Sequence, residues 1–167
     1  IGAGWNPLSY FTGNIGEILV YDRALTETEI ETVEKYLGQK WGIALAGDAN
    51  ASGIDLTSGL VAHLPFDETT GTVANDISGN NKHATLIGFD TNDSWVQGKI
   101  GGAVDLDGNN DWILAPVSLG ENFTVSMWLK TTDNQSDYHN RYDHLGSVFT
   151  GAHSTYSWSL NDGKVSL

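Results

Sequence analysis

Apolar and polar residues alternate along most of the chain, and this alternation predicts short β-strands. Leu60–Phe66 reads LVAHLPF, with an apolar residue at every second position. Phe123–Lys130 reads FTVSMWLK and alternates in the same way, with Met127 on the inward side and Trp128 on the outward side. Because successive side chains of a strand point to opposite faces, a period of two indicates half-buried strands.

Further short apolar runs extend the series of strands to the end of the chain. Residues 101–116 read GGAVDLDGNNDWILAP, which predicts two strands joined as a hairpin by a turn at Asp107–Gly108. The runs GSVFTG, YSWSL and KVSL follow. Strands that recur at short intervals with turn residues between them predict an all-β, antiparallel β-sandwich.

One amphipathic helix interrupts this pattern near the N-terminus. Thr26 and Glu29 have the spacing of a capping box at its start, and Gly42 follows its end. Its predicted apolar stripe consists of Ile30, Val33, Leu37 and Trp41. An isolated helix of this length is marginal in water, so the stripe is expected to pack on a sheet.

The strand before the helix, NIGEILVYD, also alternates. It places Ile18 and Val20 on one face and Glu17, Leu19 and Tyr21 on the other. After the helix, residues 45–58 have the small, polar and Gly-containing composition of a linker. The predicted organisation is therefore residues 1–44, a linker at 45–58, and residues 59–167.

Charge and composition narrow the functional classes. The chain has 21 acidic and 8 basic side chains, a net charge of −13, which repels nucleic acid and suits divalent cations. It has no cysteine, which excludes disulfides, thiolate metal sites and a cysteine nucleophile. No apolar run approaches the ~18 residues of a membrane span. No segment reads as a signal peptide, and we expect the chain to begin within a larger precursor.

Two parts of the sequence resemble opposite ends of one family. Residues 59–88 (GLVAHLPFDETTGTVANDISGNNKHATLIG), 98–113 (GKIGGAVDLDGNNDWI) and FTVSMWLK resemble the N-terminal half of a laminin G-like domain. That family has the concanavalin A-like jelly roll and is common in large secreted bacterial proteins. Residues 11–42 (FTGNIGEILVYDRALTETEIETVEKYLGQKWG) resemble its C-terminal end, where a last strand leads into a closing helix. The resemblance implies an antiparallel jelly-roll β-sandwich with one short packing helix near the N-terminus.

The order of the two parts is reversed relative to the family, because the end precedes the beginning. Two interpretations remain open. The chain spans the boundary between tandem repeats, or it is a cyclically shifted domain whose first segment completes the sandwich. In the second case the completing segment comes from the same subunit or from a neighbouring copy. Strands missing from a sheet leave open edges, which are templates for pairing between copies.

The sequence predicts no enzyme and no catalytic residue. Glucanases of this architecture carry Glu-x-Asp-x-Glu on one strand, which places the carboxylates on one face. Glu17 and Asp22 are five residues apart, so a strand would point them to opposite faces. The chain also contains neither Gly-x-Ser-x-Gly nor His-Glu-x-x-His.

A structural Ca²⁺ site is predicted around residues 75–81, NDISGNN. Asp76, Asn80 and nearby carbonyls offer the hard oxygen ligands that Ca²⁺ prefers. The family resemblance implies that this turn packs beside the last strand of the fold, where Glu17 occupies an acidic position. The predicted ligands are therefore Asp76, Asn80 and Glu17. The alternative is an Asx-type turn without metal.

Aromatic and planar polar residues concentrate at 131–146, TTDNQSDYHNRYDHLG, and this composition suits sugar binding. The predicted glycan-binding residues are Trp128, Tyr138, His139, Arg141, Tyr142 and Trp158. The alternative is a solvated insertion loop whose aromatic side chains pack locally.

The sequence thus predicts a non-catalytic glycan-binding or adhesion module of a large secreted multidomain protein, at a bacterial cell surface or outside the cell. Its expected partners are extracellular polysaccharides or glycoprotein glycans, with neither nucleic-acid binding nor membrane insertion. The alternative function is a self-assembling structural subunit of an extracellular fibre or matrix. In that case strand exchange between identical copies completes the fold.

Overall fold

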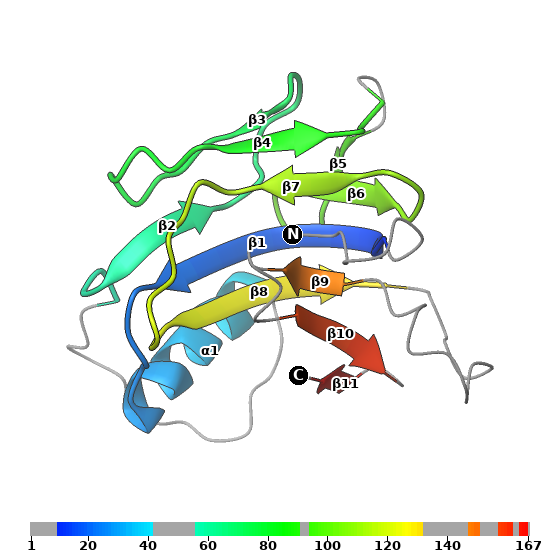
Figure 1. Ribbon diagram of the computed structural model, residues 1–167. Helices are drawn as coiled ribbons and strands as arrows, with labels where there is room; N and C mark the ends of the chain where they lie inside the picture. The colour runs from blue at the N-terminus through cyan, green and yellow to red at the C-terminus, as the bar shows by residue number, and fades with distance from the viewer. Residues whose placement is uncertain are drawn as a thin grey trace.

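The computed structural model describes residues 10–41, 56–90, 94–131, 147–150, 157–161 and 164–166. Within these ranges the chain is a β-sandwich with one helix (Figure 1). All strand pairs are antiparallel. The prediction of an all-β sandwich with one short helix near the N-terminus is confirmed.

The strands form three sheets. The five-stranded sheet, called the large sheet below, contains β1 (Thr12–Tyr21), β2 (Leu60–Leu64), β5 (Trp95–Gln97), β6 (Gly102–Asp107) and β8 (Thr124–Lys130). The small sheet contains β3 (Val73–Ala74), β4 (Ala84–Ile87) and β7 (Trp112–Leu114). A C-terminal sheet contains β9 (Ser147–Thr150), β10 (Ser157–Asn161) and β11 (Lys164–Ser166). The helix α1 spans Glu27–Trp41.

Strand β1 is the centre of the large sheet. Along one edge it pairs with β8 from Asn14 to Tyr21. Along the other edge it pairs first with β6, from Thr12 to Ile15, and then with β2, from Ile18 to Tyr21. The segment before the linker and the segment after it therefore form one sheet, as Figure 1 shows for the blue, green and yellow strands.

The small sheet, the large sheet and the helix form three layers. The main core lies between the large and small sheets and contains Ile15, Ile18, Val20, Ala62, Leu64, Phe66, Ala74, Ala84, Leu86, Val104, Leu106 and Ile113. The helix covers the opposite face of the large sheet, where Leu19 and Tyr21 pack with Val33 and Leu37. The predicted alternation of β1 is confirmed, because Ile18 and Val20 face one core and Leu19 and Tyr21 face the other.

A β-bulge at Gly16 modifies this alternation. Opposite β8, Ile15 pairs with Leu129 and Glu17 pairs with Trp128, so Gly16 is the extra residue. Ile15 and Ile18 consequently both face the main core, although their spacing is odd. The bulge leaves Glu17 on the face that the helix covers.

The helix begins with the capping box that the sequence predicts. The backbone N–H and the hydroxyl of Thr26 both donate to Glu29 Oε2, at 2.8 and 2.9 Å, and Glu29 N donates to Thr26 Oγ1 at 3.4 Å. Arg23 adds a bidentate ion pair with Glu29 at 2.7 and 2.8 Å. Within the described ranges, no helix is both long and apolar enough to cross a membrane.

The predicted apolar stripe of the helix is partly wrong. Val33 and Leu37 are buried, but Ile30 is 42% exposed. The buried face is rotated about the helix axis toward Tyr36 and Lys40, whose polar ends reach Glu17. This rotation moves Ile30 to the border of the face and into solvent.

The predicted hairpin at Asp107–Gly108 is also wrong, although the turn exists. Gly108 has a positive φ of 76°, and Asp107 Oδ1 accepts the backbone N–H of Asn109 at 2.7 Å. However, β6 pairs with β1 and β5, whereas β7 pairs with β4. The turn therefore carries the chain from the large sheet to the small sheet, because a turn signal specifies a reversal and not the strands that pair.

Candidate functional site

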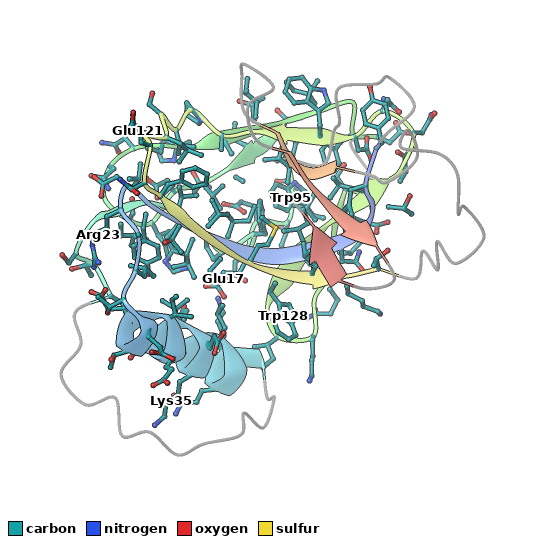
Figure 2. All side chains as sticks on the ribbon, turned by 60° about the horizontal axis from the view of Figure 1, so that its bottom comes forward. Glu17, Arg23, Lys35, Trp95, Glu121 and Trp128 are labelled. Atoms are coloured by element: carbon teal, nitrogen blue, oxygen red, sulfur yellow. The ribbon has the colours of Figure 1, made fainter. Side chains whose placement is uncertain are left out.

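A cluster of polar side chains lies between the large sheet and the helix, with Glu17 at its centre. Glu17 is completely buried. Its Oε1 atom accepts hydrogen bonds from Tyr36 Oη at 3.0 Å and Lys40 Nζ at 3.1 Å, and contacts His63 Nε2 at 2.7 Å. Figure 2 shows Glu17 between the strands and α1. The Glu17 cluster, as we call these four residues, thus joins β1, β2 and α1.

The electrostatics of the cluster follow from its burial. An isolated buried carboxylate is costly, and here a cation and two further polar groups compensate it. Burial raises the pKa of Tyr36, and the neighbouring Glu17 carboxylate raises it further, so the phenol remains a donor. Because an ionised carboxylate can only accept, the His63 ring donates its Nε2–H to Glu17. The hydrogen bonds and the ion pair of Glu17 hold the helix on the sheet.

The predicted Ca²⁺ ligand Asp76 lies in a tight turn after β3 and is buried. Its Oδ1 accepts the backbone N–H groups of His63 and Ser78, both at 2.9 Å. Its Oδ2 accepts the backbone N–H of Lys82 and the hydroxyl of Ser78, both at 2.9 Å. Burial raises the pKa of Asp76, but these hydrogen bonds outweigh it and leave the pKa below its usual value. The bond from Ser78 N is the geometry of an Asx turn.

The other two predicted ligands bind neighbouring protein groups. Asn80 Nδ2 donates to the carbonyl oxygens of Leu60 at 2.8 Å and Val61 at 3.2 Å. His63 connects Asp76 to Glu17, since its backbone N–H binds the first and its ring the second. All three predicted ligands therefore contact β2: Asp76 and Glu17 through His63, and Asn80 through Leu60 and Val61.

The donors already present at these carboxylates bear on the calcium prediction. A cation at Asp76 would have to displace hydrogen-bonded amides, and at Glu17 it would meet the Lys40 ammonium. Among the described residues, no group of three His, Asp or Glu side chains is arranged to hold a metal ion. Calcium binding therefore stays a prediction, and a test follows in the Discussion.

The predicted glycan-binding residues fall in different parts of the chain. Trp128 lies in β8 opposite Glu17, half-buried against the apolar cluster beneath the helix (Figure 2). Trp158 lies in β10, where its backbone pairs with Phe149. Four of the predicted residues lie outside the described residues, namely Tyr138, His139, Arg141 and Tyr142. The role of these six residues in glycan binding stays a prediction.

The outer face of the small sheet carries an apolar surface that the sequence reasoning missed. Val73, Thr85 and Leu114 are directly opposite one another across its three strands. Ile87 and Trp112 form the next pair on the same face. We call these five residues the platform. Val73 is 45% and Leu114 49% exposed, whereas the alternate residues of the same strands are buried in the main core.

Signals for both missed groups exist in the sequence but are weak. The platform residues alternate with core residues, but in strands of two to four residues, where a period of two is hard to recognise. Tyr36 and Lys40 are four residues apart on the helix, and His63 interrupts an apolar strand. Nothing local links them to Glu17, because His63 is 46 residues away from it in sequence.

Comparison of the chain with protein-family models, with curated proteins and with solved structures finds no match.

Proposed function

We propose that this chain is a non-catalytic module of a secreted or cell-surface multidomain protein and that it binds extracellular glycans. The observation that carries the proposal is the platform. It presents Trp112 and branched apolar side chains on a regular sheet face, next to the exposed amides of Asn109 and Asn110. Exposed apolar patches with polar rims mark interaction sites, and a Trp ring can stack on the apolar face of a pyranose.

Charge and internal chemistry support the same proposal. The net charge of −13 favours neutral glycans over polyanions. The buried carboxylates of Glu17 and Asp76 already accept hydrogen bonds from donors within the protein. These two residues therefore hold the fold together. The laminin G-like resemblance is compatible with glycan binding, although one fold can support many functions.

A glycan array tests the proposal. The intact chain is expected to select particular neutral saccharides, and Leu114→Ala and Trp112→Ala are expected to lose that selection. Ile77→Ala is the matched control, because Ile77 is the most exposed large apolar residue in the described part of the chain and lies off the platform. Melting curves identify any variant that has merely unfolded. Absence of selective binding by the intact chain, or equal binding by Leu114→Ala and Ile77→Ala, would contradict platform binding. Loss of selection in Tyr142→Ala alone would instead place the site at residues 131–146.

A second candidate function is a self-assembling structural subunit, and a different observation supports it. The strand at the centre of the large sheet, β1, precedes the linker, whereas its three partner strands follow it. A segment connected in this way is suited to exchange between copies. Electron microscopy of concentrated protein would show polymers if this is the function, and single particles if it is not.

A further inference from the structure

The segment β1–α1 fills one slot in the rest of the chain. The slot has β8 along one side and β6 and β2 along the other, so an incoming strand becomes antiparallel to all three. Without β1, the described residues leave β2 and β8 with no partner strand in the large sheet. Completing that sheet therefore requires a β1–α1 segment from some source.

The slot recognises its strand through both faces. On the core side it takes Ile15, Ile18 and Val20, all completely buried. On the helix side it takes Glu17, which His63 of β2 contacts at 2.7 Å. The helix that follows the strand then closes over Glu17 with Lys40. These contacts depend on the segment and the slot, and none of them depends on the linker.

We propose that this slot also accepts the β1–α1 segment of a second copy of the same chain. The inference deepens the second candidate function, because it names the element that is exchanged and the site that receives it. The contacts made between two copies are the same as those within one copy. A linker of this length gives an effective concentration on the order of millimolar, so exchange competes when copies are concentrated or joined in tandem. Such head-to-tail exchange builds a closed ring or an open filament.

The length of the linker determines whether β1–α1 fills the slot of its own chain or the slot of another copy. Asp22 N donates to Gly59 O at 3.0 Å, which places the end of the linker beside the start of the helix. The 15-residue helix is about 22 Å long at about 1.5 Å per residue. Residues 42–58 must therefore return the chain by about 20 Å. At about 3.3 Å per residue this needs at least about six or seven residues.

Shortening the linker is expected to force exchange. Deletion of residues 42–55 leaves residues 56–58 between the end of the helix and Gly59, and these four Cα–Cα steps span at most about 14 Å when fully extended, at about 3.6 Å per step. This length is too short to return the chain along the helix within one subunit. The deletion variant is then expected to fold only by exchanging β1–α1, and to elute as dimers or larger assemblies in size-exclusion chromatography.

Engineered cysteines report the exchange directly, because the chain has none of its own. Asn14 of β1 and Asp105 of β6 are opposite each other, and Asn14 Nδ2 lies 2.6 Å from Asp105 Oδ1. Directly opposed residues of an antiparallel pair have the Cα separation that a disulfide needs. One full-length chain carries Asn14→Cys, the other carries Asp105→Cys, and the two are refolded together at millimolar concentration and oxidised. Ser118→Cys, at an exposed position outside the strands, replaces Asp105→Cys in the control mixture.

A disulfide-linked heterodimer well above the control is the expected result, with a higher yield in the 42–55 deletion background. Cross-linking no greater than the control, together with a monomeric or unfolded deletion variant, would overturn the inference. Electron microscopy of the cross-linked material separates this inference from the proposed fibre function. Closed dimers with the disulfide would support exchange and contradict a fibre, whereas fibres without it would show assembly through another surface.

Discussion

Removal of the Lys40 cation from the Glu17 cluster is expected to weaken the helix–sheet interface strongly. In Lys40→Met the aliphatic stem is nearly preserved, but the completely buried Glu17 carboxylate loses its positive partner. Breaking a buried ion pair by removing one member typically costs about 3–5 kcal/mol. The polar contacts from Tyr36 and His63 to Glu17 remain, so the lower half of that range is expected.

The converse change, Glu17→Gln, is expected to cost less. It leaves the Lys40 ammonium without its carboxylate, but that side chain is 24% exposed and can be hydrated. The loss of charge-assisted hydrogen bonds then costs about 1.5–3 kcal/mol. In the double variant neither charge is left uncompensated. Its cost is therefore expected to fall at least about 1 kcal/mol below the sum of the two single changes.

Urea unfolding measures these differences. With a slope of about 2 kcal/mol per molar, a loss of 3 kcal/mol moves the midpoint by about 1.5 M. Lys130→Met is the matched control, because Lys130 is an exposed residue of β8, and it is expected to change stability by less than about 0.5 kcal/mol. If Lys40→Met behaves like Lys130→Met, or if the two changes in the cluster are additive, the ion pair does not stabilise the interface and the reasoning is refuted.

Three further predictions concern other parts of the structure. If calcium binds at Asp76, excess chelator lowers the melting temperature of the intact chain but not of Asp76→Ala; an unchanged melting temperature in the intact chain dismisses the site. Arg23 and the helix cap lower the pKa of Glu29 to about 2, below its usual 4.5. Their stabilisation is therefore fully present above about pH 4.5 and is lost as the pH falls toward 2, and Glu29→Gln removes this pH dependence from acid-unfolding curves. Gly88 has a positive φ of 89°, and an added Cβ would clash with the backbone carbonyl oxygen of Asn110. Gly88→Ala is expected to cost more than about 1 kcal/mol by calorimetry, whereas Gly120→Ala, with open space around it, leaves stability nearly unchanged.

Sequence patterns predicted the structure correctly where the interacting residues are close together in the chain. The capping box of Thr26 and Glu29 spans only four residues, so its geometry could be read directly from the sequence. The faces of β1 followed from alternation, because a strand has only two faces. The sandwich class followed from strand spacing and turn residues.

The sequence did not predict strand pairing or the buried face of the helix, because both depend on segments far apart in the chain. Which strand pairs with β6 depends on β1, about 90 residues earlier, so the turn at Gly108 could not reveal it. Ile30 has the correct helical period but is exposed, because the helix rotates to bring Lys40 to a carboxylate on another element. The laminin G-like identity, the division at residues 45–58 and the glycan-binding loop remain predictions for the same reason, since each depends on partners beyond the local sequence.

The central position of β1 has a consequence for how the protein matures. Arg23, just after this strand, accepts a hydrogen bond from Thr124, 101 residues further along the chain. During synthesis or export from the N-terminus, β1 emerges before its three partner strands and must wait for β8 before the sheet can close. Such long-range pairing slows folding and leaves an apolar strand unprotected in the meantime. The protein is therefore expected to depend on a chaperone, or on nearby copies of itself, until its last partner strand has emerged.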